Sequence, residues 1–308
     1  MPDNDSYYAH GKLLLTGEYL ILKGAEGLAL PLKLGQKLKT SYYPEENILH
    51  WKAYKPGGLW FEGKFDTKNF TILETSDEIF SEKLKDILLK TKNLNTAFLE
   101  RKSITVETIL EFDPQFGFGS SSTLIVNIAR WAKVDPFMLQ KLTFKGSGYD
   151  IAAGMTKSPI VFSIYNETPK YKQVNFLPPF AENLFFVYLG KKQKSFNEVQ
   201  RFIKDSKFSD KNIQSINTIT KEVLTCQSLE KFEYLMIEHE NILSEILKTT
   251  PVRKKLFSFY KDGVIKSLGA WGGDFVLVTS KVEKEKFIKE MNNHGFTTVF
   301  SFKELILY

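Results

Sequence analysis

The sequence is poor in cysteine and has no long apolar run, and each of these shortages excludes a class of structure. Among its 308 residues Cys226 is the single cysteine, which excludes an intramolecular disulfide and a metal site built from cysteine alone. No apolar run approaches the roughly 18 residues of a transmembrane helix. The start MPDNDSYYAH lacks the basic and apolar regions of a secretory signal. We therefore expect a cytoplasmic protein that does not bind a membrane.

Several standard catalytic and nucleotide-binding motifs are also missing. Gly11-Lys12 is followed by leucine, so it does not complete G-x-x-x-x-G-K-[ST]. Ser122 stands where a G-x-G-x-x-G pattern needs its last glycine. There is no His-Arg-Asp or Asp-Phe-Gly set, no G-x-S-x-G and no H-E-x-x-H. These absences argue against P-loop, Rossmann, protein-kinase, hydrolase-elbow and zinc-peptidase chemistry.

The net charge of +6 fits three kinds of partner: nucleic acid, an anionic membrane surface or a small anionic substrate. The lysines are interleaved with acids, as in KVEKEKFIKE, and this is typical of a solvated helix face. The charge pattern therefore argues against a nucleic-acid partner, and a small anionic metabolite stays open as the partner. The sequence leaves a homodimer open.

Strand and helix patterns are mixed in both halves of the chain, and the length suggests about two domains. The stretches ILHWKAY and GLWFEGKFD flank Pro56-Gly57-Gly58 and predict a hairpin, while EIFSEKLKDILLKTKNL has apolar residues at helical spacing. The Pro178-Pro179 break predicts a division into domains 1–178 and 179–308. The expected fold class is therefore α+β.

The stretch GFGSSST lies between a strand pattern and an apolar helix pattern from Thr123 to Ala132. Serines are good N-cap residues, so a plain capping loop is one interpretation. The other is an anion site, because a helix N-terminus has unpaired N–H groups and a partial positive charge. Glycines let the backbone approach a phosphate, and serine hydroxyls bind phosphate oxygens or Mg²⁺. This loop alone leaves both interpretations open.

Two more glycine clusters follow along the chain. In FKGSGYDIAAG, Asp150 follows Gly146 and Gly148, where a carboxylate serves either as a general base or as a helix cap. The turn SLGAWGGDF either lets a ligand approach closely or is an ordinary hairpin. The recurrence of glycine clusters strengthens the ligand-binding interpretation.

Together, these segments resemble the GHMP kinase family, which includes galactokinase, homoserine kinase, mevalonate kinase and phosphomevalonate kinase. The segments GKLLLTGEYLIL, GFGSSST, GSGYDIAAG and SLGAWGGD resemble its motifs in the family's order. The resemblance implies ATP-dependent phosphoryl transfer to a hydroxyl or phosphate oxygen. It also implies an N-terminal α/β domain with a left-handed βαβ unit and a C-terminal ferredoxin-like domain, with the active site in the cleft between them.

The resemblance further implies roles for individual residues. The ATP phosphates would bind at Gly117, Gly119, Ser120, Ser121 and Ser122, with Ser121 (or Ser120) on Mg²⁺. Asp150 would be the catalytic base, and Lys12 would neutralise the charge of the transferred group. The expected substrate residues are Glu18, Gly148, Tyr149, Lys192, Ser195, Gly269, Gly272 and Gly273.

The segment GSGYD resembles the phosphomevalonate kinase branch most, so phosphomevalonate is the first expected acceptor and mevalonate the second. Lys192 and Ser195 lie in GKKQKSFNEV, which is either a substrate loop or a solvated loop. Trp271 replaces a glycine of the third motif, and PFMLQKLTFKG has no glutamate to match the family's second Mg²⁺ ligand. These departures keep a second hypothesis open: a catalytically silent protein that binds nucleotide or metabolite and regulates partners.

Overall fold

The computed structural model describes residues 4–43, 47–99, 103–144, 146–190, 202, 207–269 and 274–308. The chain folds into two compact units, each built from separate stretches of sequence. The first unit holds Met1–Gly11, Leu34–Pro114 and Phe118–Met155, and the second holds Lys12–Lys33, Gln115–Gly117 and Thr156–Tyr308. They do not coincide with the predicted segments 1–178 and 179–308, because the chain enters the second unit at Lys12 and again at Thr156.

The first unit combines antiparallel and parallel strand pairs with helices. Strand β3 pairs with β4 in antiparallel fashion and with β6 in parallel, and β6 pairs with the C-terminal part of β2. Its elements are β1 (Asn4–Leu14), β2 (Gly27–Tyr43), β3 (Ile48–Lys55), β4 (Gly58–Asp66), β5 (Ile72–Thr75), α1 (Glu78–Leu94), β6 (Ser103–Leu110), η2 (Pro114–Phe116), α2 (Ser120–Ala132), α3 (Pro136–Thr143) and α4 (Tyr149–Met155). Three of them, β1, β2 and η2, continue into the second unit.

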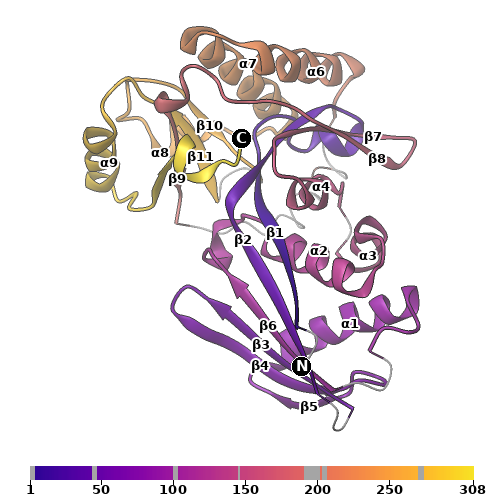
Figure 1. Ribbon diagram of the computed structural model, residues 1–308. Helices are drawn as coiled ribbons and strands as arrows, with labels where there is room; N and C mark the ends of the chain where they lie inside the picture. Colours follow the sequence, from indigo (N-terminus) through magenta and orange to yellow (C-terminus); the bar gives the residue numbers. More distant parts are fainter. Residues whose placement is uncertain are drawn as a thin grey trace. The chain divides into compact units, whose positions relative to one another are not determined.

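Helices α1, α2 and α3 lie on the same side of the strands of the first unit (Figure 1). One hydrophobic core joins the two layers, and it includes Trp51 and Phe65 from the strands and Leu88 and Ile128 from the helices. The apolar alternation of the strands and the helical spacing of α1 and α2 supply these side chains. Helix α1 covers the predicted stretch, and β3 and β4 form the predicted hairpin.

The second unit contains a four-stranded antiparallel sheet in the order β10-β11-β9-β12. Along the chain its strands and helices follow a β-α-β-β-α-β order, with the α6–α7 pair as the first helical connection and α9 as the second. This is the ferredoxin-like arrangement, as predicted for the C-terminal half. Phe185, Tyr260 and Phe287 belong to its core.

The remaining part of the second unit is a small strand group in which the N-terminal part of β2 pairs with β7, and β7 pairs with β8. The elements of this unit are η1 (Leu20–Lys23), β7 (Ile160–Tyr165), β8 (Thr168–Gln173), η3 (Ala181–Asn183), β9 (Leu184–Tyr188), α6 (Asp210–Thr225), α7 (Leu229–Leu247), α8 (Val252–Leu256), β10 (Ile265–Ser267), β11 (Phe275–Thr279), α9 (Lys284–Asn293), β12 (Val299–Ser301) and α10 (Phe302–Leu305). The structure confirms the α+β class.

Candidate functional site

Helix α2 starts earlier than the sequence pattern suggested. Its N-cap is Gly119, with a φ of 90° and no capping side chain, and Ser120 is the first helical residue. The expectation that a serine caps this helix is therefore wrong: all three serines lie in its first turn. Glycine takes the cap position because its positive φ is costly for residues with a Cβ.

The three serines differ in exposure and partners. Ser122 is buried and its hydroxyl donates to the Gly119 carbonyl at 2.9 Å, whereas Ser120 is half-buried and Ser121 is exposed. The first N–H that bonds back into the helix is that of Thr123, which reaches the Gly119 carbonyl at 2.9 Å. No acidic residue lies in this first turn. The start of α2 is thus suited to an anion.

Side chains of α2 anchor the helix to strand β2. The Thr123 hydroxyl donates to Gln36 Oε1 at 2.9 Å, and Asn127 Nδ2 donates to the Gln36 carbonyl at 2.8 Å. Thr123 and Asn127 are both fully buried, so these bonds form away from competing water. The helix start is therefore held by the sheet beneath it.

Asp150 lies in the first turn of α4, which begins one residue earlier at Tyr149, so it is not the cap of that helix. Its Oδ1 accepts from Gln140 Nε2 at 2.9 Å and from the Ile151 N–H at 3.1 Å. Gln140 is buried, whereas Asp150 and Tyr149 are half-buried. Gly148 has a φ of 90°, and a Cβ there would lie 3.0 Å from Phe137 Cδ1. Gln140 therefore orients a carboxylate that water still reaches.

Lys12 and Gly117 meet within the second unit. Lys12 Nζ donates to the Gly117 carbonyl at 2.9 Å. Gly117 has a φ of 68°, and a Cβ at this position would come within 2.2 Å of Asp274 Oδ2. Only glycine fits this turn, because both its backbone angle and its neighbour exclude a side chain.

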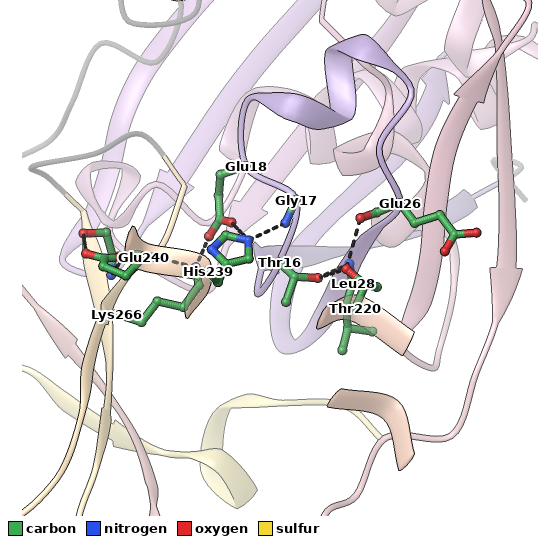
Figure 2. A network of polar contacts seen from close by, with 10 residues as sticks. Thr16, Gly17, Glu18, Glu26, Leu28, Thr220, His239, Glu240 and Lys266 are labelled. Atoms are coloured by element: carbon green, nitrogen blue, oxygen red, sulfur yellow. Dashed lines mark hydrogen bonds and ion pairs between the residues drawn. The ribbon is translucent and has the colours of Figure 1, made fainter. Parts of the chain in front are cut away.

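Glu18 lies at the centre of a buried polar cluster in the second unit (Figure 2). Lys266 Nζ donates to Glu18 Oε1 at 2.5 Å, and Glu18 Oε2 lies 3.2 Å from His239 Nε2. The Gly17 N–H donates to the same His239 Nε2 at 2.9 Å. Glu240 accepts from the Ser267 hydroxyl at 2.9 Å and from its N–H at 3.2 Å. We call Glu18, His239, Glu240, Lys266 and Ser267 the buried cluster.

Burial controls the protonation of this cluster. It raises the pKa of Glu18 from 4.5 to about 7, although Lys266 opposes the shift. It lowers the pKa of His239 well below 6.5, and the charge of Lys266 adds to this effect. Burial also raises the pKa of Glu240, against the influence of Lys266 and the bonds from Ser267. Desolvation disfavours whichever form is charged, which explains why the acids and the imidazole shift in opposite directions.

This environment removes Glu18 from the predicted substrate contacts. Its side chain is 1% exposed and already bound to Lys266, so no substrate group has room to reach it. Glu18 therefore supports the turn after β1 and is not a residue that touches substrate.

Four predicted substrate residues, Lys192, Ser195, Gly272 and Gly273, lie outside the described residues, as does Trp271. Gly269 is described: its φ is 66° and it follows the short strand β10. A Cβ at Gly269 would have none of the described residues' atoms within 4 Å. These positions stay predictions.

The sequence pattern gave no role to Gln140, His239, Glu240 or Lys266. One signal was available for α7: His239 and Glu240 occupy positions at helical spacing from buried Phe232, Met236 and Leu243. Polar residues on the apolar stripe of a helix indicate a buried polar network. Lys266 carries no such signal, because a three-residue strand is too short to show a pattern.

A cavity of about 380 Å³ in the second unit contains none of the predicted site residues; residues 175–178 and the C-terminal part of α6 line it. Within the described ranges, no group of three or more His, Cys, Asp or Glu side chains is arranged to hold a metal. The hydroxyl of Ser121 suits Mg²⁺ only as one oxygen ligand beside phosphate oxygens, which is the usual way that Mg²⁺ is bound. No described helix combines the length and apolar character needed to span a bilayer.

The sequence matches no protein-family model and no curated protein. Solved structures do match over nearly the whole chain. Methanococcus jannaschii mevalonate kinase aligns with a TM-score of 0.70 at 16% identity, covering 99% of both chains. Streptococcus pneumoniae phosphomevalonate kinase, in complex with phosphomevalonate and AMPPNP, aligns with a TM-score of 0.68 at 16% identity, covering 99% of this chain and 98% of the other. Lactococcus lactis galactokinase, complexed with galactose, aligns with a TM-score of 0.68 at 13% identity, covering 99% and 94%.

This chain has the GHMP kinase fold. The resemblance inferred from four short segments is thereby confirmed at the level of the fold. In this GHMP kinase fold, Lys12 lies near the end of β1, Ser121 in the first turn of α2 and Asp150 in the first turn of α4. At such low identity the matches leave the acceptor and the individual site residues to be argued from this chain's own chemistry.

Proposed function

We propose that this protein is an ATP-dependent kinase that transfers the γ-phosphoryl group to a small anionic metabolite, with phosphomevalonate as the first candidate acceptor and mevalonate as the second. The observation that carries the proposal is the start of α2. It presents a first turn of three serines after a glycine cap, with no acidic residue and with Ser121 exposed. Phosphate groups are among the anions that such a turn stabilises.

Each proposed residue has a distinct task. Backbone N–H groups of Ser120, Ser121 and Ser122 bind phosphate oxygens, and Gly117 and Gly119 give the backbone the shape that this requires. Mg²⁺, held by the Ser121 hydroxyl and the nucleotide, supplies charge neutralisation when bound. Lys12 adds positive charge for the transferred group. Phosphoryl transfer depends mainly on such positioning and charge.

Asp150 is the proposed base. Its half-buried carboxylate accepts the proton of an acceptor hydroxyl, or orients a phosphate acceptor that is already ionised. The Gln140 bond to Oδ1 fixes the rotamer of the carboxylate. Gly148 and Tyr149 place it in the first turn of α4.

A second candidate is a catalytically silent protein that binds nucleotide or metabolite. Trp271 in place of a glycine and the lack of a glutamate in PFMLQKLTFKG favour it. The presence of Lys12, Ser121 and Asp150 favours the enzyme.

A coupled ADP-release assay with a panel of mevalonate-pathway acids separates the two candidates. We expect acceptor-dependent ADP release with phosphomevalonate or mevalonate, and about 10³-fold slower release from Asp150→Asn. Nucleotide binding without acceptor-dependent turnover on any acid of the panel would support the silent candidate instead.

A further inference from the structure

The contact between Glu18 and His239 raises a question of proton placement. Both side chains are at most 1% exposed, and Glu18 Oε2 lies 3.2 Å from His239 Nε2. The Gly17 N–H already donates to that nitrogen at 2.9 Å, so Nε2 presents a lone pair and carries no proton. Glu18 Oε2 has no hydrogen-bond partner among the described residues. Two buried acceptors would therefore repel each other unless a proton lies between them.

We propose that Glu18 and His239 share one buried proton, carried on Glu18 Oε2 and donated to His239 Nε2, and that this neutral pair positions the turn that follows Lys12. The imidazolium alternative fails on geometry, because a proton on Nε2 would face the Gly17 N–H. Nε2 then accepts two donors in a three-centre bond. His239 is then the Nδ1–H tautomer, although Nδ1 has no hydrogen-bond partner among the described residues.

The neighbouring charges agree with a neutral Glu18–His239 pair. Lys266 is the one cation of the buried cluster. Burial raises the pKa of Glu240, but the charge of Lys266 and the two bonds from Ser267 oppose this shift, and we therefore assign Glu240 as the counter-charge of Lys266. If Glu18 were also ionised, the buried cluster would carry an uncompensated negative charge. Burial raises the pKa of Glu18 to about 7 and keeps the pKa of His239 well below 6.5, and both shifts favour the neutral side chain.

Three contacts hold the turn between β1 and β2, and the Glu18–His239 pair takes part in two of them. Gly17 bonds to α7 through His239, and Glu18 bonds to β10 through Lys266. The Thr16 hydroxyl pairs with that of Thr220 on α6 at 2.8 Å. Lys12 lies on β1 shortly before this turn, and its ammonium bonds to Gly117. Glu18 and His239 are thus positioning residues for Lys12, a role that rests on the proposed function.

The proton is bound to a different residue in the unfolded and the folded protein. At about pH 5.5 the ordinary pKa values, 4.5 for glutamate and 6.5 for histidine, place the proton on His239 in the unfolded chain. In the folded protein Glu18 holds it. Both states then bind one proton, and unfolding moves it without uptake or release by this pair.

Replacing Glu18 and replacing His239 change the number of protons bound on unfolding in opposite directions. At pH 5.5, Glu18→Gln leaves a histidine that is neutral when folded and protonated when unfolded, so unfolding takes up one proton more than in the wild type. His239→Gln leaves a glutamate that is protonated when folded and ionised when unfolded, so unfolding releases one proton more. The double variant returns to the wild-type number. Calorimetry in buffers of different ionisation enthalpy measures these proton numbers.

One exposed residue provides a matched control. Glu230→Gln leaves the number unchanged, because the hydrogen bond from Lys281 lowers the pKa of Glu230 and its carboxyl is ionised at pH 5.5 in both states. Single variants that both match the wild type, or that shift in the same direction, overturn the shared proton. If His239→Gln does not fold, ¹⁵N NMR of wild-type histidines decides: a neutral Nδ1–H signal from His239 that does not titrate between pH 5 and 8 supports the proposal, and an imidazolium signal overturns it.

Kinetics test the positioning role separately. We expect Glu18→Ala to lower kcat about tenfold with little change in the nucleotide KM, and Glu18→Gln, which mimics the protonated acid, to recover most of the loss. Equal losses in both variants overturn the positioning role. A wild-type protein without transfer activity overturns the proposed function and the positioning role with it, whereas the proton number is decided by calorimetry alone.

Discussion

Ser121 and Glu18 both belong to segments that the sequence marked as functional, yet the structure surrounds them in opposite ways. Ser121 is exposed in the first turn of a helix with no acidic neighbour in that turn. Glu18 is 1% exposed, bound to Lys266 and in contact with His239. The first environment leaves polar groups available to a ligand, and the second uses them to hold the fold. Motif membership therefore does not distinguish a residue that binds substrate from one that supports the site.

The largest expected effect is on kcat, and it concerns Asp150, which we propose acts on the substrate. Asp150→Asn should lower kcat about 10³-fold, because it removes the proposed base while Gln140 can still donate to the remaining oxygen. Nucleotide affinity and the unfolding midpoint should stay near wild type. Steady-state kinetics and thermal unfolding check this. Asp210→Asn, which alters an exposed first-turn carboxylate of α6, is the matched control and should leave kcat unchanged. A fully active Asp150→Asn would remove Asp150 as the base.

The second prediction concerns Lys266, a member of the buried cluster that supports the fold. Lys266→Met should lower the free energy of unfolding by about 3 kcal/mol, because it leaves the buried Glu240 without its counter-charge and Glu18 Oε1 without its donor. Denaturant titration measures the change. The matched control is Lys281→Met, which breaks the exposed pair with Glu230, 59% and 69% exposed, and should have no measurable effect. Equal results for the two variants would contradict a special role for the buried cluster.

Gly17→Ala sharpens the same comparison at the backbone. Gly17 has a φ of 88°, and a Cβ there would lie 2.7 Å from the Gly27 Cα, so we expect a loss of about 2 kcal/mol or more. Gly57→Ala has a similar φ of 100° but nothing within 4 Å, and should cost only the backbone strain, about 1 kcal/mol. The difference between the losses of unfolding free energy in the two variants measures the cost of the contact between the new Cβ and Gly27. Equal losses would show that strain alone decides.

The smallest effect separates two adjacent serines. Ser121→Ala should raise the KM for MgATP about tenfold, which corresponds to about 1.4 kcal/mol, without loss of stability. Ser122→Ala should instead lower stability by about 1 kcal/mol, because its buried hydroxyl bonds to Gly119. Kinetics and unfolding measured on both variants check the contrast. If Ser121→Ala has an unchanged KM, the metal role passes to Ser120 or to water.

Local sequence patterns predicted much of the fold. The apolar spacing of α1 and the Pro56-Gly57-Gly58 turn between β3 and β4 were correct, because each depends on neighbouring residues alone. The start of α2 was placed too late, since a serine-rich first turn and a serine cap look alike in sequence. The two-unit division was also beyond local patterns, because it depends on a chain path that leaves the first unit at Lys12 and returns at Leu34.

Local sequence is enough to predict the order of the elements and the reactive groups that they carry: glycine turns, serine hydroxyls, a carboxylate near a helix start and a lysine before a turn. These follow from periodicity and from the conformational freedom of glycine, which act over a few residues. The contacts of Glu18 with His239 and Lys266, more than 200 positions away, depend instead on how the whole chain packs. Burial then set their protonation, because desolvation depends on everything packed around a group and not on its neighbours in the chain.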